Sequence, residues 1–109
     1  MQRLPKQIAL AELAGAPVDL YTVPANTKTT ISACSVTNKS DAARTVTVLV
    51  RQGGGAARHL AYKLGVAAGE TRVVHGALAQ TLETGGVLSA HGDAGGALDI
   101  VVSAYETNP

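Results

Sequence analysis

The sequence has no tryptophan and no phenylalanine, and three tyrosines are its only aromatic residues. Sugar sites usually present exposed aromatic platforms, so this is a poor supply of rings for a glycan-binding protein. The apolar content comes instead from Val, Leu, Ile and many Ala, which bring less apolar area per residue than large rings do. We therefore expect a thin core that leans on neighbouring subunits for part of its stability.

Cysteine is almost absent as well. Cys34 is the single cysteine among 109 residues, which excludes an internal disulfide and a multi-cysteine zinc site. No apolar run is long enough for a membrane span, and the first residues lack the apolar segment of a signal peptide. The sequence predicts one domain, residues 1–109, which folds in a reducing cytoplasm and has no membrane partner.

The charge has no strong sign. Nine basic and eight acidic residues give a formal charge of +1, and the two kinds are interspersed. Nucleic-acid binding needs clustered cations, whereas Arg44, Arg51 and Arg58 are scattered over strand and loop positions. We expect no nucleic-acid partner.

What the chain does have is short apolar alternation. Val46, Val48 and Val50 share one face of residues 44–51, and the apolar residues of 98–104 alternate in the same way. Residues 58–64 place Leu60, Tyr62 and Leu64 on one side. Shorter strands of this kind are expected at residues 18–23, 70–75 and 87–91. With Gly-, Asn- and Asp-rich turns between them, these runs predict an all-β protein: an antiparallel, jelly-roll-like β-sandwich of about eight strands.

Three segments are less regular. Residues 7–14 fit neither period cleanly, and we predict a strand because they lead into the extended run at 18–23. Residues 76–84 are compatible with one helical turn. Within residues 29–37 the alternation slips, which indicates either a β-bulge near Ser32 or Ala33 or a strand with both faces partly covered.

Several turn and strand-end motifs have a further meaning. They are LYTVPANT at residues 20–27, VTN at 36–38, AGET at 68–71 and IVVSAYE at 100–106. Together these motifs resemble those of small β-sandwich structural proteins of tailed bacteriophages. The resemblance covers about residues 18–106. It departs at Asn26, where Gly is commoner, and at Gly86, where Asp is usual after Gly85.

The resemblance implies a place in the virion, after assembly in the host cytoplasm, and a non-enzymatic role. Within it we expect a head decoration or cement protein, a minor capsid protein that stabilises the shell by bridging major capsid subunits. A homo-oligomer, expected to be a trimer, fits such a role. The alternatives are a neck, baseplate or tail-fibre component and, from another class, a host-glycan-binding module.

Candidate contact residues are the two chain ends, taken as arms at residues 1–6 and 107–109, and two hairpin tips. The predicted interface comprises Met1, Gln2, Arg3, Leu4, Lys39, Ser40, Asp41, Gly53, Gly54, Gly55 and Tyr105. Tyr21 is a further candidate, although we favour a structural role for its ring, which would cap one end of the sandwich.

Few residues of the sequence are candidates for a catalytic or a metal-binding site. His59, His75 and His91 are expected on three separate strands, so they do not converge as metal ligands must. Cys34 lies in an apolar strand, where cysteine is usually a small buried hydrophobe and not a nucleophile. His91 and Asp93 adjoin a glycine-rich turn that offers no oriented base. We predict no catalytic residue, no metal and no cofactor.

Overall fold

The computed structural model describes residues 2–52, 55–93 and 95–108, and for residues 2–4 and 108 the backbone alone. Nine strands and one short helix follow one another along the chain. They are β1 (Gln2–Glu12), β2 (Val18–Thr22), β3 (Lys28–Asn38), β4 (Arg44–Arg51), β5 (Arg58–Val66), β6 (Thr71–Val73), the 3₁₀ helix η1 (His75–Ala77), β7 (Thr81–Leu82), β8 (Val87–Gly92) and β9 (Leu98–Asn108). In this described part, η1 is far too short to cross a membrane.

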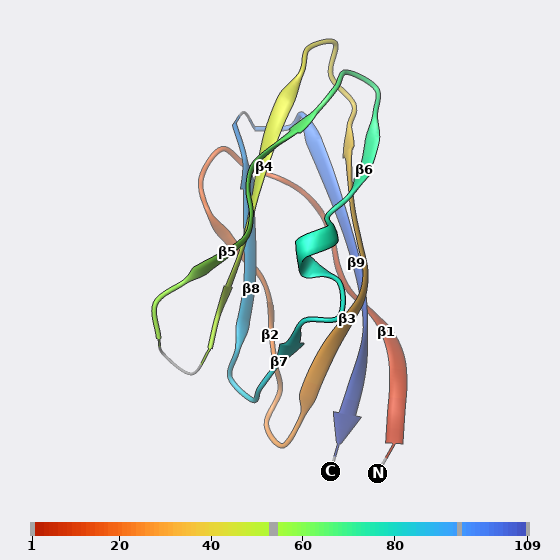
Figure 1. Cartoon of the computed structure of the whole chain (residues 1–109), viewed down its shortest axis with the longest axis vertical. Helices are drawn as coiled ribbons and strands as arrows, with labels where there is room; N and C mark the ends of the chain where they lie inside the picture. The colour runs from red at the N-terminus through yellow and green to blue at the C-terminus, as the bar shows by residue number, and fades with distance from the viewer. Residues whose placement is uncertain (1, 53–54, 94, 109) are drawn as a thin grey trace.

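The strands form two antiparallel sheets that pack face to face (Figure 1). One has the order β1-β9-β3-β6, with β7 also paired to β3, and the other has the order β2-β8-β4-β5. Because β6 and β7 share one edge position, the sandwich has eight strand positions. This interleaving of two four-position sheets is the jelly roll, and the predicted fold class is confirmed.

The core lies between the sheets, where the predicted alternation is clearest. Leu98, Ile100 and Val102 of β9 have no exposed surface, and they face Val46 and Val48 of β4, which are equally buried. Side chains of successive strand residues point to opposite faces, so every second residue enters this layer. Small β-branched and aliphatic side chains fill it.

The slip of alternation in β3 is a β-bulge. The register between β3 and β9 shifts between Ile31 and Ala33, so Ser32 is the extra residue. Its hydroxyl donates to the carbonyl of Ser103 at 3.1 Å. The bulge lets both Ile31 and Cys34 point into the core, which a regular strand could not do. The bulge prediction is confirmed.

Alternation fails in β5. The register against β4 shifts twice, between Val46 and Val48 and again between Val48 and Leu49. Lys63 has φ of 50°, in the left-handed region. As a result Tyr62, predicted to share a face with Leu60 and Leu64, turns outward and is 64% exposed. That part of the prediction was wrong because single bulges reverse the face of everything beyond them.

The two predicted arms are strand ends. Residues 2–6 are part of β1 and pair with residues 104–108 of β9, from Gln2 opposite Asn108 to Lys6 opposite Ala104. The arm at 1–6 and the tail at 107–109 are therefore corrected, apart from Met1 and Pro109, which lie outside the described residues. The two chain ends lie side by side at one end of the sandwich (Figure 1).

The segment after β5 is shorter in strand than predicted. The strand expected at 70–75 is limited to β6, and His75 begins η1. Residues 76–84 contain the rest of this single helical turn and then β7. The strand predicted at 7–14 starts earlier, and a register shift between Gln7 and Ala9 explains its unclear period.

Candidate interaction surfaces

The predicted interface residues lie in separate places. Lys39, Ser40 and Asp41 occupy the β3–β4 loop at one end of the sandwich, whereas residues 2–4 and Tyr105 belong to the β1–β9 pair near the other end (Figure 1). Gly55 is in the β4–β5 loop, where its N–H donates to the Gln52 carbonyl at 2.7 Å. Met1, Gly53 and Gly54 lie outside the described residues. These positions do not form one continuous site.

The loop residues among them are already engaged within the chain. The Lys39 ammonium contacts Glu12 and lies 3.2 Å from Asp99, and these hydrogen bonds, first that to Glu12, raise the pKa of Lys39. The Ser40 hydroxyl donates to the Asn38 side-chain oxygen at 2.7 Å. Asp41 remains exposed with no ion pair among the described residues.

Tyr21 caps one end of the sandwich. Its phenol donates to Glu106 at 2.5 Å and shares a hydrogen bond of 2.8 Å with Thr29, so it joins β2 of one sheet to β9 and β3 of the other. Burial, and then the hydrogen bond to the Glu106 carboxylate, raise the pKa of Tyr21 to about 12. Tyr105 instead lies on the outer face of β9, opposite Pro5 on one side and Thr30 on the other.

The three histidines stay apart. His59 contacts Tyr62 edge to face, with ring centroids 4.8 Å apart, while His75 starts η1 and His91 lies in β8. In the described ranges no three His, Cys, Asp or Glu side chains gather as metal ligands would. Cys34 is buried, and this burial raises the pKa of its thiol to about 11, which makes it a poor nucleophile at neutral pH.

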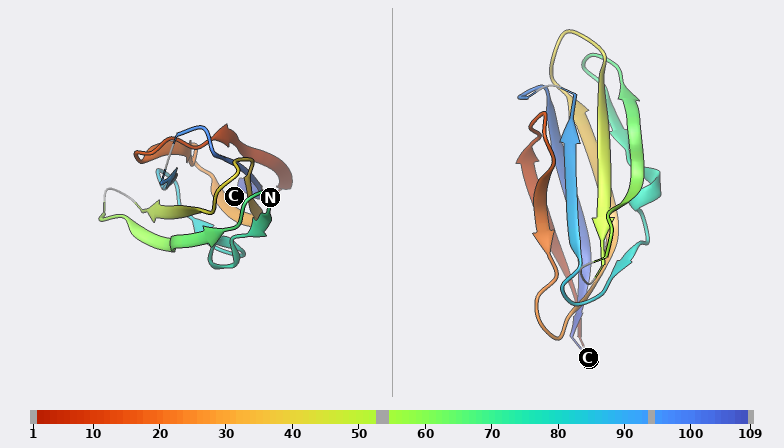
Figure 2. Two further views of the ribbon diagram at one scale, coloured as in Figure 1. Left: turned by 90° about the horizontal axis from the view of Figure 1, so that it is seen from above. Right: turned by 90° about the vertical axis from the view of Figure 1, so that its left-hand side faces the viewer.

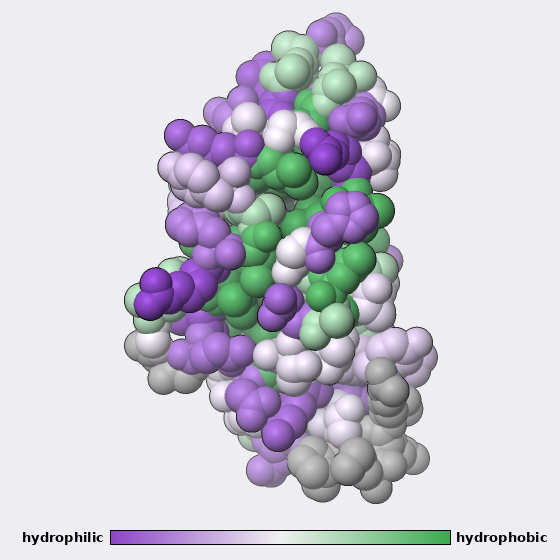
Figure 3. Space-filling model, viewed as in Figure 1, coloured by the Kyte–Doolittle hydropathy of each residue, from purple (hydrophilic) through white to green (hydrophobic). Residues whose placement is uncertain are grey.

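A cleft lies on the side of the sandwich where the two sheets part. It lies between β5 and the β6–η1 segment and has a volume of about 210 Å³. Leu60, Ala61, Tyr62 and Leu64 line it from β5, and residues 72–76 from the opposite side. Figure 3, in the orientation of Figure 1, shows an apolar strip along this opening with polar groups on both sides. We call it the β5–η1 cleft.

The rim of the β5–η1 cleft combines exposed apolar groups with cations. Tyr62 and Val73 are 64% and 44% exposed, two of the largest apolar exposures in the described chain. The Lys63 ammonium lies 5.4 Å from the centre of the Tyr62 ring, a cation–π contact. From β6, Arg72 donates to the Gly65 carbonyl at 2.8 Å, and this bond spans the opening between the sheets.

The floor of the cleft is fixed by a close backbone approach. A Cβ atom at Gly76 would lie 2.1 Å from the carbonyl oxygen of Leu60, so only glycine fits there. Val74 and Ala77, on either side of it, are fully buried and pack in the same core as the sheets. The helix η1 is thereby pressed against β5.

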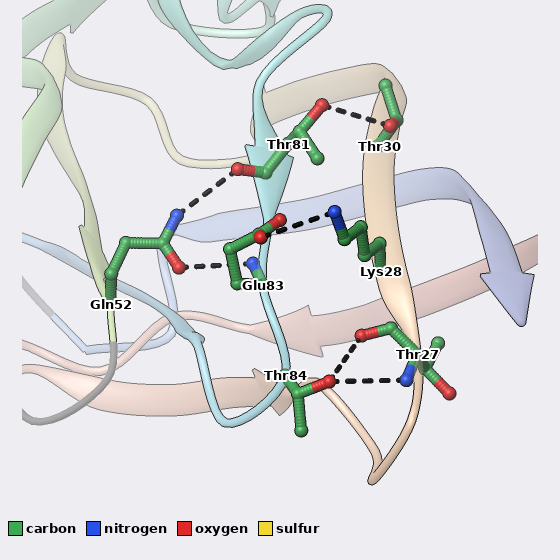
Figure 4. A network of polar contacts seen from close by, with 7 residues as sticks. All are labelled: Thr27, Lys28, Thr30, Gln52, Thr81, Glu83 and Thr84. Carbon is green, nitrogen blue, oxygen red and sulfur yellow. Dashed lines mark hydrogen bonds and ion pairs between the residues drawn. The ribbon is translucent and has the colours of Figure 1, made fainter. Parts of the chain in front are cut away.

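A polar network secures the segment that follows η1 (Figure 4). The Gln52 side chain donates to the Thr81 carbonyl and accepts from the Glu83 N–H, both at 3.1 Å. Lys28 pairs with Glu83 at 3.4 Å, and the Thr84 hydroxyl donates to the Thr27 carbonyl at 2.8 Å. These contacts tie the end of β4 to β7 and β3, hence one sheet to the other.

The outer face of the five-stranded sheet, which contains β1, β9, β3, β6 and β7, is a second, flatter surface. One cross-strand row runs Leu10, Val101, Ser35 and Val73 over β1, β9, β3 and β6. Leu10 is 71% exposed. A shallow depression next to this row is lined by Leu10, Ala11, Glu12, Thr37, Asp99 and Val101. The face therefore offers apolar and hydroxyl side chains in a plane, with the Lys39 ion pairs at its end.

Sequence reasoning did not find the β5–η1 cleft. The available signal was Tyr62 beside Lys63 in a strand otherwise rich in aliphatic residues, but alternation placed that ring inside. Val73 falls in the strand predicted at residues 70–75, and Gly76 begins the segment 76–84, which was compatible with one helical turn. The cleft arises from the meeting of two distant segments, which no local pattern indicates.

No family model matches the chain, and no curated protein matches it in sequence. In structure, it is similar to a chain of infectious bursal disease virus, Gx strain, with a TM-score of 0.53 and 14% sequence identity. The similarity covers 98% of this chain and 32% of the viral chain, so this chain spans about a third of that neighbour's length. At this identity the likeness establishes the fold: the whole chain is one jelly roll of a kind also built into that viral protein.

Proposed function

We propose that this chain is a non-enzymatic structural protein of a virus particle and, more specifically, a head decoration protein of a tailed bacteriophage. The observation that supports it best is the jelly-roll fold over 98% of the chain, shared with a chain of infectious bursal disease virus. Jelly rolls are a recurrent fold of viral capsid domains. The turns behind the bacteriophage resemblance are also formed, with left-handed backbone at Asn26 and Gly69.

The physical role of such a protein is to add many weak contacts to a shell. Its partners would be other copies of itself, as a trimer, and the major capsid protein. Each contact can be modest because a decoration protein that touches several subunits gains by multivalency. The β5–η1 cleft and the outer face of the five-stranded sheet supply apolar area for these contacts, and the end loops supply polar contacts.

The direct test is the protein content of purified particles from the source of this sequence. Quantitative mass spectrometry should give a copy number comparable to that of the major capsid protein, and electron cryo-microscopy should place a jelly roll on the outer shell. A copy number far below that of the capsid protein would move the chain to the neck, baseplate or fibre. Absence from the particles would overturn the virion role altogether.

A further inference from the structure

We propose that the β5–η1 cleft binds an extended segment of a partner protein in which apolar side chains alternate with carboxylates. The inference rests on the proposed structural role, because the segment would then belong to a neighbouring protein of the virion. It concerns the recognition chemistry of one surface, and that chemistry can be measured on the isolated chain.

That the segment carries apolar side chains is inferred from the floor and rim of the cleft. Leu60 and Leu64 are only partly buried although they pack against the core, and Tyr62 and Val73 are more exposed still. Burial of apolar surface is the main favourable contribution to most protein–protein associations. A segment lying in the cleft would cover the exposed side of these residues and complete the sandwich at its open side (Figure 3).

That the segment carries carboxylates is inferred from the distribution of charge on this chain. Among the described residues, Lys6, Lys28, Lys39 and Arg51 each have a carboxylate partner within the ion-pair distance. No ion pair involves the other described cations, which are Arg44, Arg58, Lys63 and Arg72, and all four belong to β4, β5 or β6.

Arg72 is among the residues that line the cleft, and Lys63 lies against the ring of Tyr62, which also lines it. No Asp or Glu is among the residues that line the cleft. The neighbouring Glu70 accepts the N–H of Ala67 within its own turn at 3.0 Å. Complementary charge steers association and selects partners, so this rim favours a segment that brings carboxylates.

The dimensions favour a segment over a small ligand. A volume of about 210 Å³ is below the roughly 300–1,000 Å³ of ordinary small-molecule sites. The cleft is bounded along its length by a strand on one side and by β6 and η1 on the other, which suits an extended chain. The two bulges of β5 spoil a regular edge, so side chains rather than added strand pairing must supply most of the specificity.

The test uses the ¹⁵N-labelled full chain and synthetic peptides. The first probe is a capped peptide of about seven residues, roughly 23 Å when extended, in which Val or Ile alternates with Glu. A matched peptide carries Lys in place of every Glu, and a third carries Ser in place of every Val and Ile. Amide shifts in residues 58–66 and 71–77 are expected with the first peptide, and binding about tenfold weaker with each of the others.

Two variants test the assignment of the rim, and a third on another surface is their control. Lys63→Asn removes one cation and introduces asparagine, a residue that tolerates the left-handed backbone at this position. The affinity for the acidic peptide should fall about threefold. Lys28→Asn removes the same charge on another surface and should leave the affinity unchanged. Tyr62→Ser, which removes the exposed ring, should abolish the shifts while the rest of the amide spectrum stays that of the folded chain.

Three outcomes would overturn the inference. The acidic and lysine peptides could bind equally, the shifts could lie outside β5, β6 and η1, or cleft amides could shift with protein concentration alone. The last result would make a second copy of this chain the occupant. None of these measurements uses virus particles, so their failure would leave the particle test of the proposed function standing, and the reverse also holds.

Discussion

At the scale of single residues, the fold depends on a few positions where the surrounding atoms leave no choice of side chain. Gly76 lies against the backbone of β5, and Asn38 is a polar residue with no exposed surface. Ordinary turn residues tolerate replacement, whereas these two positions connect segments that are distant in the sequence. Predictions at this scale therefore contrast a constrained residue with a similar but unconstrained one.

Gly76→Ala should destabilise the protein by about 2–3 kcal/mol, the range of overpacked cores. The reason is the 2.1 Å approach that the new Cβ would make to the Leu60 carbonyl oxygen. Gly65→Ala is the matched control, because nothing lies within 4 Å of a Cβ there, and its effect should stay within about 0.5 kcal/mol. Urea unfolding of both variants measures the difference, and equal midpoints would contradict the packing of η1 on β5.

Asn38→Ala should cost about 3 kcal/mol, more than the loss of one ordinary hydrogen bond. The Asn38 amide donates to the carbonyls of Ala42 at 2.8 Å and Val66 at 3.0 Å, and its oxygen accepts from the Ser40 N–H at 2.9 Å. The variant removes all three bonds, and the one to the Val66 carbonyl is fully buried. Thr37→Ala, which breaks an exposed bond to Thr71, should cost well under half as much in the same unfolding experiment.

The raised pKa of Tyr21 predicts that the protein loses stability at alkaline pH. Its pKa is about 12 in the folded chain and 10.0 when unperturbed, so the unfolded chain releases this proton first as the pH rises. Stability is then complete below pH 10 and falls towards pH 12. Tyr21→Phe should show a smaller decline between about pH 8 and about pH 11 in urea unfolding. Parallel declines in the two proteins would contradict the link between β2 and β9.

At the scale of elements, β1 decides whether the N-terminus is an arm or a strand. Deletion of residues 1–6 should lower stability by about 1–3 kcal/mol, because backbone pairing with β9 is lost. Hydrogen exchange gives a sharper readout: β9 amides that face β1 should exchange faster, and those that face β3 should stay protected. Lys6→Ala, which removes only the ion pair to Glu106 at 3.6 Å, should have little effect.

An unchanged hydrogen-exchange pattern after the deletion would mean that residues 1–6 are an arm and not a strand paired with β9. The two interpretations differ in function as well, since an arm can reach a neighbouring subunit and a paired strand cannot. With β1 paired to β9, residues 2–6 do not form such an arm, and the proposed contacts fall to the side, the outer face and the end loops of the sandwich.

Some elements could be predicted from local sequence patterns, and others could not. Alternation predicted β4, β8 and β9, and its slip predicted the bulge at Ser32, because each depends on neighbours in the sequence. The face of Tyr62 depends on bulges in β5 that only pairing with β4 defines. The pairing of residues 2–6 depends on residues 104–108, at the other end of the chain. Contacts between residues so far apart in the sequence leave no periodic signal, and the β5–η1 cleft is formed by contacts of this kind.

At the scale of the whole molecule, the jelly roll separates its ends from its sides. The views in Figure 2 place β1 and β2 on one side of the sandwich and β5, β6 and η1 on the other. The chain termini meet at one end, and the β3–β4, β5–β6 and β8–β9 connections meet at the opposite end (Figure 1). A protein arranged in this way can contact different neighbours through separate surfaces, as the proposed shell role requires.

This arrangement predicts that the chain tolerates circular permutation. Gln2 and Asn108 are paired across β1 and β9, so a short Gly/Ser linker can join the termini without strain. New ends between Ala56 and Ala57 fall in the exposed β4–β5 loop and break no strand. The permuted chain should unfold in one cooperative transition and keep the amide spectrum of the parent outside the loop and linker.

A second permutant serves as the control. New ends between Ile100 and Val101 cut through the middle of β9, which pairs with both β1 and β3, so this chain should not fold cooperatively. If both permutants unfold alike, the strand order is wrong at its centre. If the first also fails, the closeness of Gln2 and Asn108 is wrong, and with it the pairing of β1 that leaves the proposed contacts to the sides and loops of the sandwich.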